Sequence, residues 1–402
     1  MPLLIKNCRL LIKGKVYSKN ILIKNGKIAK ISSKKEIFAD NVINAKNNFV
    51  LPGLIDCHVH FRDPGLTHKE DFLTGSMAAA KGGVTTFLDM PNTIPPTVTA
   101  KALSEKRKLA AKSVVNYGLY FGATNENIEE IKKAKNIAAV KLYMDYTTGD
   151  LKVDDVDAIC DVLKESRITV IHAEGENVKS AVDIMAKNKI KNHLHLAHAS
   201  SQKELIYAKQ NKISRQVSVE VSPHHLFMNE KSLQEFGAFA EMKPRLKTEH
   251  DQKALWQGIR SGMIDVIATD HAPHLRGEKE TANYPFGVPG VETMLPLMLD
   301  AFNSGRIDLP SIIGLCCENP AKIFRIKSKG FIKEGYDADL VIVDLDKRQA
   351  VRNEDLLTKC KWSPYDGKIL KGWPVTTIVN GNVAYDKGGI FDVKGKEISY
   401  EK

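Results

Sequence analysis

Short strand-like runs separated by turn residues occupy both ends of the chain. Segment 21–28 (ILIKNGKI) carries an Asn-Gly pair between apolar runs, which is a strong hairpin signal. Segments 339–343 (DLVIV) and 377–383 (TIVNGNV) have the same character, and nothing between them has the pattern of a long helix. We therefore predict that residues 1–50 and 336–402 pair into one small β-sandwich domain.

The middle of the chain has a different pattern, in which strand-like runs alternate with helical stretches. Such alternation is typical of parallel βα units. The eight candidate strands lie at residues 54–60, 84–90, 116–122, 137–143, 167–172, 193–198, 216–222 and 263–270. Around the first predicted helix, Thr67–Glu70 has the sequence of a capping box and Gly82 ends the helical run. We predict an α/β fold in which residues 51–335 form a (β/α)8 TIM barrel, with the active site at the C-terminal ends of the strands.

The composition is that of a protein with a large core. Its 402 residues are 43% hydrophobic, which is enough to fill a barrel and an appended domain. The first residues do not resemble a signal peptide, and no apolar run is long enough to cross a bilayer, so we expect a cytoplasmic protein. The six cysteines are scattered without a CxxC pair, which predicts free thiols.

The formal charge of +11 raises the question of an acidic partner such as nucleic acid. The lysines, however, are spread along the whole chain and often stand in mixed runs, as in residues 129–133 (EEIKK). Such runs are typical of solvated helix faces. We therefore predict no nucleic-acid site and no membrane contact.

The predicted strand ends carry residue types that bind metals. His58 and His60 end the first strand, and because side chains alternate along a strand, both rings face the same way. The later strands carry or end in Lys141, His172, His198, Glu220 and Asp270. Imidazoles and carboxylates that converge on one barrel mouth suit zinc or a similar divalent ion. A structural or ligand-supporting role is expected for the neighbouring histidines, His193, His195, His224, His225 and His271.

Several segments together resemble the dihydroorotases of the amidohydrolase superfamily. They are 56–65 (DCHVHFRDPG), 90–93 (MPNT), 219–226 (VEVSPHHL), 269–274 (TDHAPH) and 287–293 (GVPGVET). The resemblance runs in order from about residue 50 to residue 330, and the flanking β-domain also fits the superfamily. It implies a zinc-dependent cyclic amidohydrolase that reversibly cyclises N-carbamoyl-L-aspartate to L-dihydroorotate in de novo pyrimidine (UMP) biosynthesis.

The resemblance also implies two zinc ions per chain. His58, His60 and Asp270 would hold one ion, and His172 and His198 the other. Lys141 would bridge both ions after carboxylation by CO2, which turns an ammonium into an anionic bidentate group; the alternative for Lys141 is a salt-bridging or surface lysine. Some relatives hold a third metal through a cysteine before the sixth-strand histidine. Ala197 occupies that place here, so no third ion is expected, although Glu220 remains.

By the same resemblance, the pocket binds a small acid. Asp270 would be the catalytic acid-base group, and Arg62 would hold the substrate carboxylate in a bidentate contact. The further substrate-binding residues implied are Asn92, His274, Lys243, Phe286, Gly287 and Thr147. Thr147 belongs to segment 145–149, a polar loop that resembles a mobile lid.

Two other interpretations of the sequence are a related cyclic amide hydrolase and an inactive scaffold. Hydantoinases and allantoinases share the metal ligands and the reaction, and only residues such as Arg62 and Asn92 favour dihydroorotase over them. A catalytically inactive scaffold would lack ligands, and none is missing here. The partner expected is the small-molecule substrate, and both a homodimer and an association with aspartate transcarbamoylase are open.

Overall fold

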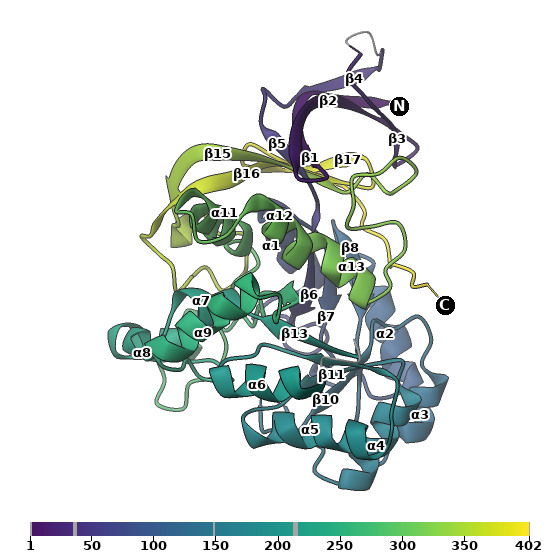
Figure 1. Cartoon of the computed structure of the whole chain (residues 1–402), viewed down its shortest axis with the longest axis vertical. Coiled ribbons are helices and arrows are strands. Elements are labelled where there is room, and N and C mark those ends of the chain that lie inside the picture. The colour runs from purple at the N-terminus through teal and green to yellow at the C-terminus, as the bar shows by residue number, and fades with distance from the viewer. Residues whose placement is uncertain (1, 35–37, 148, 212–215, 402) are drawn as a thin grey trace.

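The terminal segments of the chain share one sheet in the computed structural model, which describes residues 2–34, 38–147, 149–211 and 216–401 (Figure 1). Among these residues the sheet has nine strands, in the order β18-β17-β16-β15-β5-β1-β2-β3, with β4 paired to β1. Their bounds are β1 Leu3–Ile12, β2 Lys15–Lys24, β3 Lys27–Ser32, β4 Asn41–Asn44, β5 Phe49–Pro52, β15 Leu340–Ala350, β16 Ile369–Val379, β17 Asn382–Asp386 and β18 Gly389–Ile390. The predicted pairing of the two ends is confirmed, because β5 and β15 are antiparallel neighbours with Leu51 opposite Val341.

Parallel strands form the middle of the chain, and every predicted strand range contains one. They are β6 Leu54–Val59, β7 Val84–Asp89, β8 Asn116–Leu119, β9 Phe121–Gly122, β10 Val140–Tyr143, β11 Ile168–His172, β12 His193–Leu196, β13 Val217–Val221 and β14 Val266–Ile267. Hydrogen bonds order them as β6-β7-β8 and as β9-β10-β11-β12-β13-β14. Only Tyr120 separates β8 from β9, and a parallel bridge joins Val59 to His271 beyond β14. The two parallel sheets are therefore linked on both sides.

Helices follow most of the parallel strands and lie outside them (Figure 1). Their bounds are α1 Phe72–Lys81, α2 Ala100–Ala110, α3 Ile128–Lys133, α4 Val156–Glu165, α5 Glu176–Lys187, α6 Gln202–Asn211, α7 Pro223–Phe227, α8 Glu230–Phe236, α9 Glu249–Arg260, α10 Arg276–Lys279, α11 Met294–Asn303, α12 Leu309–Ile313 and α13 Asn319–Ile323. This arrangement confirms the α/β class, while closure into a TIM barrel and the sandwich form of the terminal sheet stay predictions.

The capping box of helix α1 was predicted at the wrong residues. Asp71, not Thr67, is the N-cap, and its side chain accepts from the backbone N–H groups of Leu73 and Thr74. Glu70 is buried and accepts from the backbone N–H groups of Asp71, at 3.4 Å, and of Lys359, at 3.2 Å, so its partners differ from the predicted one at Thr67. The predicted helix end at Gly82 is confirmed.

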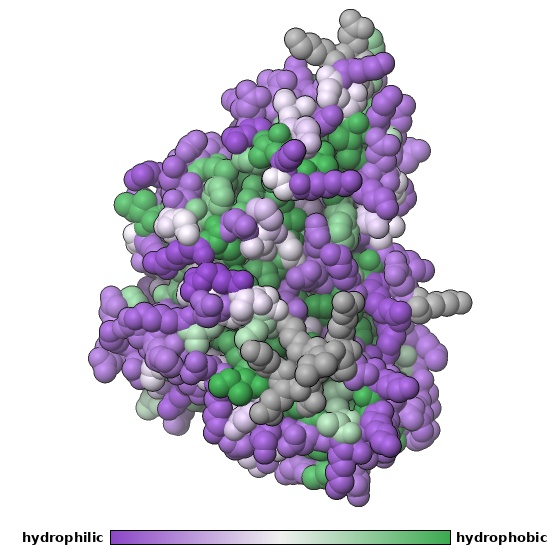
Figure 2. Space-filling view, in the orientation of Figure 1, coloured by the Kyte–Doolittle hydropathy of each residue, from purple (hydrophilic) through white to green (hydrophobic). Residues whose placement is uncertain are grey.

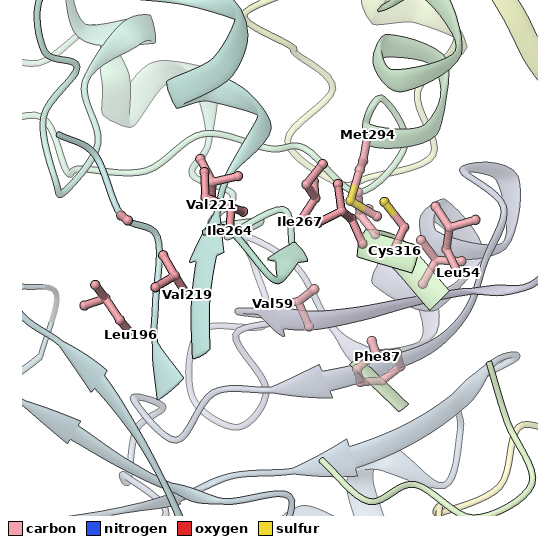
Figure 3. Close-up of a cluster of buried hydrophobic side chains, with 14 of the residues drawn as sticks. Leu54, Val59, Phe87, Leu196, Val219, Val221, Ile264, Ile267, Met294 and Cys316 are labelled. Atoms are coloured by element: carbon pink, nitrogen blue, oxygen red, sulfur yellow. The ribbon is translucent and has the colours of Figure 1, made fainter. Parts of the chain in front are cut away.

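The core lies between the parallel strands and their helices. Figure 3 shows buried side chains of β6, β7, β12 and β13, which belong to one cluster with Met294 of α11. Strands β6 and β13 are buried at every position, as expected of parallel strands covered on both faces. All six cysteines are free and buried, which confirms the prediction of free thiols. On the face in Figure 2 hydrophilic residues cover most of the surface, and none of the helices described has the length and apolar content needed to span a bilayer.

Candidate active site

One pocket gathers twelve of the thirteen residues predicted to form the site. Its lining consists of His58, His60, Arg62, Asn92, Lys141, Tyr143, Thr147, His172, His198, Lys243, Asp270, Ala272, Phe286 and Gly287. The thirteenth predicted residue, His274, does not line the pocket but lies directly behind Arg62, with its Nε2 atom 3.1 Å from the Arg62 Nη2 atom. The pocket opens at the C-terminal ends of β6, β10, β11 and β12, which is where ligands bind in folds of this type.

The first group of candidate ligands consists of His58, His60 and Asp270. The Nε2 atoms of the two histidines lie 3.3 and 3.1 Å from the Asp270 Oδ1 atom, so the three side chains converge on one point. The Nδ1 atoms face away and are held by Glu220 Oε1 at 2.8 Å and by Asn92 Oδ1 at 2.7 Å. Such partners fix the ring orientation and leave Nε2 as the ligand atom.

The second group consists of His172, His198 and Lys141. The His172 Nδ1 and His198 Nε2 atoms are 2.8 Å apart. The other ring nitrogens, His172 Nε2 and His198 Nδ1, and the Lys141 Nζ atom are buried without a hydrogen-bond partner among the residues described. Each buried nitrogen without a partner is costly, about 1 to 3 kcal/mol. The three residues line the same pocket, which fits a site that a cation completes.

Electrostatics favours the protonation states that metal binding needs. Burial lowers the pKa of His60 to about 4 and that of His172 to about 3, so both rings are neutral at pH 7. Burial opposes ionisation of Asp270, but the imidazoles of His58 and His60 outweigh it and hold the Asp270 pKa well below its usual value. Burial also lowers the pKa of Lys141 to about 8, which increases the fraction of neutral amine.

Three residues of the site have left-handed backbone conformations although none is glycine. The φ angles are 64° at Arg62, 38° at His198 and 48° at Asp270. Such conformations cost about 1 to 3 kcal/mol each and persist where the surrounding structure holds them. These backbone conformations therefore reduce local stability, but they direct the three side chains into the pocket.

The buried guanidinium of Arg62 forms one side of the pocket. Arg62 is only 2% exposed, and its Nε atom donates to the Pro273 carbonyl at 3.2 Å. Burial lowers its pKa to about 10, so the guanidinium stays charged at neutral pH. His274 lies between the cations of Arg62 and Lys69, with its Nδ1 atom 3.1 Å from Lys69 Nζ and its Nε2 atom also 3.0 Å from the Phe286 carbonyl oxygen. Among the described side chains, no carboxylate lies within hydrogen-bonding distance of the Arg62 guanidinium. The guanidinium is therefore suited to bind an acidic ligand.

Thr147, which belongs to the predicted lid at residues 145–149, lines the pocket. The Lys243 Nζ atom donates to the Tyr146 carbonyl at 3.0 Å and sits 4.9 Å from the ring centre of Phe286. Lys243 therefore connects the segment to the far wall of the pocket. Thr148, which belongs to the same predicted lid, lies outside the described residues.

Sequence reasoning did not select Tyr143 or Ala272, which also line the pocket. The Tyr143 hydroxyl is buried without a hydrogen-bond partner among the described residues. A signal for it was present, because Tyr143 stands two positions after Lys141 on β10 and therefore on the same face. Ala272 carries no comparable signal.

Comparisons with known proteins agree with this geometry. Residues 49–384 match the model of the amidohydrolase family. The chain is 36% identical to a dihydroorotase of Methanosarcina acetivorans, covering 96% of this chain and 92% of that protein. It is 37% identical to a dihydroorotase of Pyrococcus abyssi, covering 94% of each. Among solved structures, the L-hydantoinase of Arthrobacter aurescens superposes with a TM-score of 0.94 at 29% identity over 99% of both chains.

Proposed function

Because the chain belongs to the amidohydrolase family, we infer from its pocket and its relatives that it is a dihydroorotase, which reversibly cyclises N-carbamoyl-L-aspartate to L-dihydroorotate in pyrimidine biosynthesis. The curated relatives compared above carry this name over nearly the whole chain. The observation that carries the inference is the buried Arg62 guanidinium in the same pocket as the metal-binding side chains. An acidic substrate bound by Arg62 would lie directly beside the side chains proposed to hold the metal ions that drive hydrolysis.

The alternative is a hydantoinase, because the L-hydantoinase of Arthrobacter aurescens has nearly the same fold. Hydantoin is a neutral ring without a carboxylate, and a buried Arg62 has no function in holding it. A spectrophotometric assay with dihydroorotate, run beside hydantoin and allantoin, separates the two activities. Hydrolysis of dihydroorotate with little hydrolysis of the other two supports our inference, and the reverse order refutes it.

We propose that the pocket binds two zinc ions. His58, His60 and Asp270 would hold one and His172 with His198 the other, with carboxylated Lys141 between them. Support comes from the converging nitrogen and oxygen atoms, the unpaired buried nitrogens, and a lysine whose lowered pKa favours the neutral amine that reacts with CO2. When bound, two such cations generate a nucleophile from water at neutral pH and polarise the scissile carbonyl.

The side chains of the protein would carry out the remaining steps. Asp270 is ionised at neutral pH and takes the proton of the attacking water, which it then delivers to the leaving amide nitrogen. Arg62, together with Asn92 and His274, holds the substrate carboxylate and fixes the ring against Phe286. Lys243, Gly287 and Thr147 close the pocket around the ring, and Thr147 contacts the substrate if segment 145–149 acts as a lid.

We also propose a division into a closed (β/α)8 barrel over residues 51–335 and a β-sandwich formed by residues 1–50 and 336–402. The continuous chain at Tyr120 and the bridge from Val59 to His271 support closure. A shark protein with the name multifunctional protein CAD matches 85% of this chain with 15% of its own length. We propose a cytoplasmic enzyme that acts beside other pyrimidine enzymes, as a homodimer or with aspartate transcarbamoylase, and the match to part of a multifunctional protein fits the second arrangement. Gel filtration alone and with aspartate transcarbamoylase tests both.

A further inference from the structure

A line of hydrogen-bonded side chains extends from the metal-binding residues into the interior of the parallel sheet. The Glu220 Oε1 atom is 2.8 Å from His58 Nδ1, and its Oε2 atom is 3.2 Å from His195 Nε2. The Ser218 Oγ atom is 2.7 Å from His195 Nδ1 and 2.7 Å from His193 Nε2. His58, His195 and Glu220 are each at most 1% exposed, so solvent does not replace the contacts of Glu220 with the two histidines.

The donors and acceptors of this line can be assigned in order. The Nε2 atom of His58 faces Asp270, so its ring proton is on Nδ1 and is donated to Glu220. An ionised carboxylate only accepts, so His195 donates to Glu220 through its Nε2–H group and keeps Nδ1 as an acceptor. Ser218 then donates its hydroxyl proton to His195 and accepts from His193. Every hydrogen bond in the line has one donor and one acceptor.

Glu220 also contacts the second group of candidate ligands. Its Oε1 atom accepts from the backbone N–H of His198 at 2.9 Å, and its Oε2 atom is 3.4 Å from the Cys57 Sγ atom. One carboxylate thus holds the ring of His58 and the backbone of His198, and its own position depends on His195.

We propose that His195 is a positioning residue for the metal centre. It lies three residues before His198, does not line the pocket, and acts through Glu220. By donating to Oε2 it keeps Oε1 directed at His58 and His198, which fixes the tautomer of one ligand and the backbone position of another. The proposal rests on the two-metal site of the proposed function.

The alternative is that these side chains bind a third metal ion. The candidate ligand atoms of Cys57, His195 and Glu220 lie within 4.8 Å of one another. The hydrogen-bond geometry favours positioning, because both Glu220 oxygens already accept two contacts and His195 Nδ1 is bonded to Ser218. The experiment therefore has to count ions as well as measure affinity.

The test compares the His195→Phe and His195→Gln variants with the parent enzyme. Each protein is freed of metal with a chelator and titrated with Co2+, and the dissociation constant and visible absorption spectrum of each bound ion are recorded. We expect His195→Phe to bind one or both ions about 10- to 100-fold more weakly, with an altered spectrum. The Gln side chain can still donate an N–H to Glu220, so His195→Gln should recover much of the affinity. His250→Gln, at an exposed histidine that contacts only Gln202 among the contacts described, is the control and should bind Co2+ as the parent does.

Circular dichroism and thermal unfolding show whether each variant is folded. If His195→Phe does not fold, His195→Gln and Ser218→Ala decide, and both should weaken Co2+ binding by smaller factors. Parent-like affinity and spectrum in all His195 and Ser218 variants would overturn the proposal. So would a third Co2+ ion in the parent, with a thiolate charge-transfer band that disappears in Cys57→Ser. Failure of the parent to bind two ions would instead refute the two-metal site itself.

Discussion

Replacement of Arg62 by methionine tests how the pocket selects an acid. The methionine keeps an apolar stem of similar length and removes the planar guanidinium that would hold the substrate carboxylate. Arg62 is 2% exposed and its Nε donates to the Pro273 carbonyl, so the guanidinium is already fixed before substrate binds. We therefore expect the loss to appear in catalysis on dihydroorotate and not in metal binding.

The size of the effect follows from burial. Removing one partner of a buried, hydrogen-bonded charge pair costs about 2 to 5 kcal/mol. Since about 1.36 kcal/mol corresponds to a factor of ten, kcat/KM for dihydroorotate should fall about 30- to 5,000-fold. The loss of the bond to Pro273 adds about 1 kcal/mol to the destabilisation of the variant, which is small enough to leave it folded at 25 °C.

The assay compares dihydroorotate with dihydrouracil, the same ring without the carboxylate. Arg62→Met should reduce the preference for dihydroorotate while leaving turnover of dihydrouracil and the metal content near those of the parent. Arg245→Met is the matched control, because that side chain is 59% exposed at the pocket mouth and 5.9 Å from the Phe286 ring centre. An unchanged kcat/KM for dihydroorotate in Arg62→Met, or an equal fall in both arginine variants, would show that Arg62 does not bind the carboxylate.

Three further changes test the metal site and the frame around it. Lys141→Ala should lose bound zinc and activity together, and metal analysis that finds a fully active parent with one ion would contradict the bridge. Asp270→Asn should lower kcat by about 100- to 10,000-fold because an amide cannot accept the proton; near-normal turnover with retained metal would exclude Asp270 as the base. Lys106→Met should reduce the free energy of unfolding by about 3 to 5 kcal/mol, because it leaves Asp89 buried without its partner at 2.6 Å. Urea denaturation measures this, and a loss below about 1 kcal/mol would show that the pair contributes little.

The sequence was sufficient to predict the candidate ligands because their signal is local. Alternation along a strand placed His58 and His60 on one face, and the ends of parallel strands meet at one edge. The positions of His172, His198 and Asp270 at predicted strand ends followed from the same rule. The structure brings all of these side chains into one pocket.

The supporting contacts were not predictable because they join distant segments. Glu70 is bonded to the backbone of Lys359, which no local capping pattern indicates. Lys106 of α2 reaches Asp89 at the end of β7, and a buried lysine is not distinguishable from a surface lysine in a helix by its spacing. The orientation of His195 toward Glu220 depends on the register between β12 and β13, in which His195 stands opposite Ser218.

The pairing of β5 with β15 has a consequence for how the chain folds during synthesis. Leu51 of β5 pairs with Val341 of β15, which is synthesised about 290 residues later, so β5 has no partner on that side until then. At roughly 5 to 20 residues per second, the ribosome needs about 15 to 60 s to supply the partner. The parallel strands from β6 to β14 are all synthesised within that interval. The terminal sheet is therefore completed last, and its buried apolar face is the part of the nascent chain most in need of protection from aggregation.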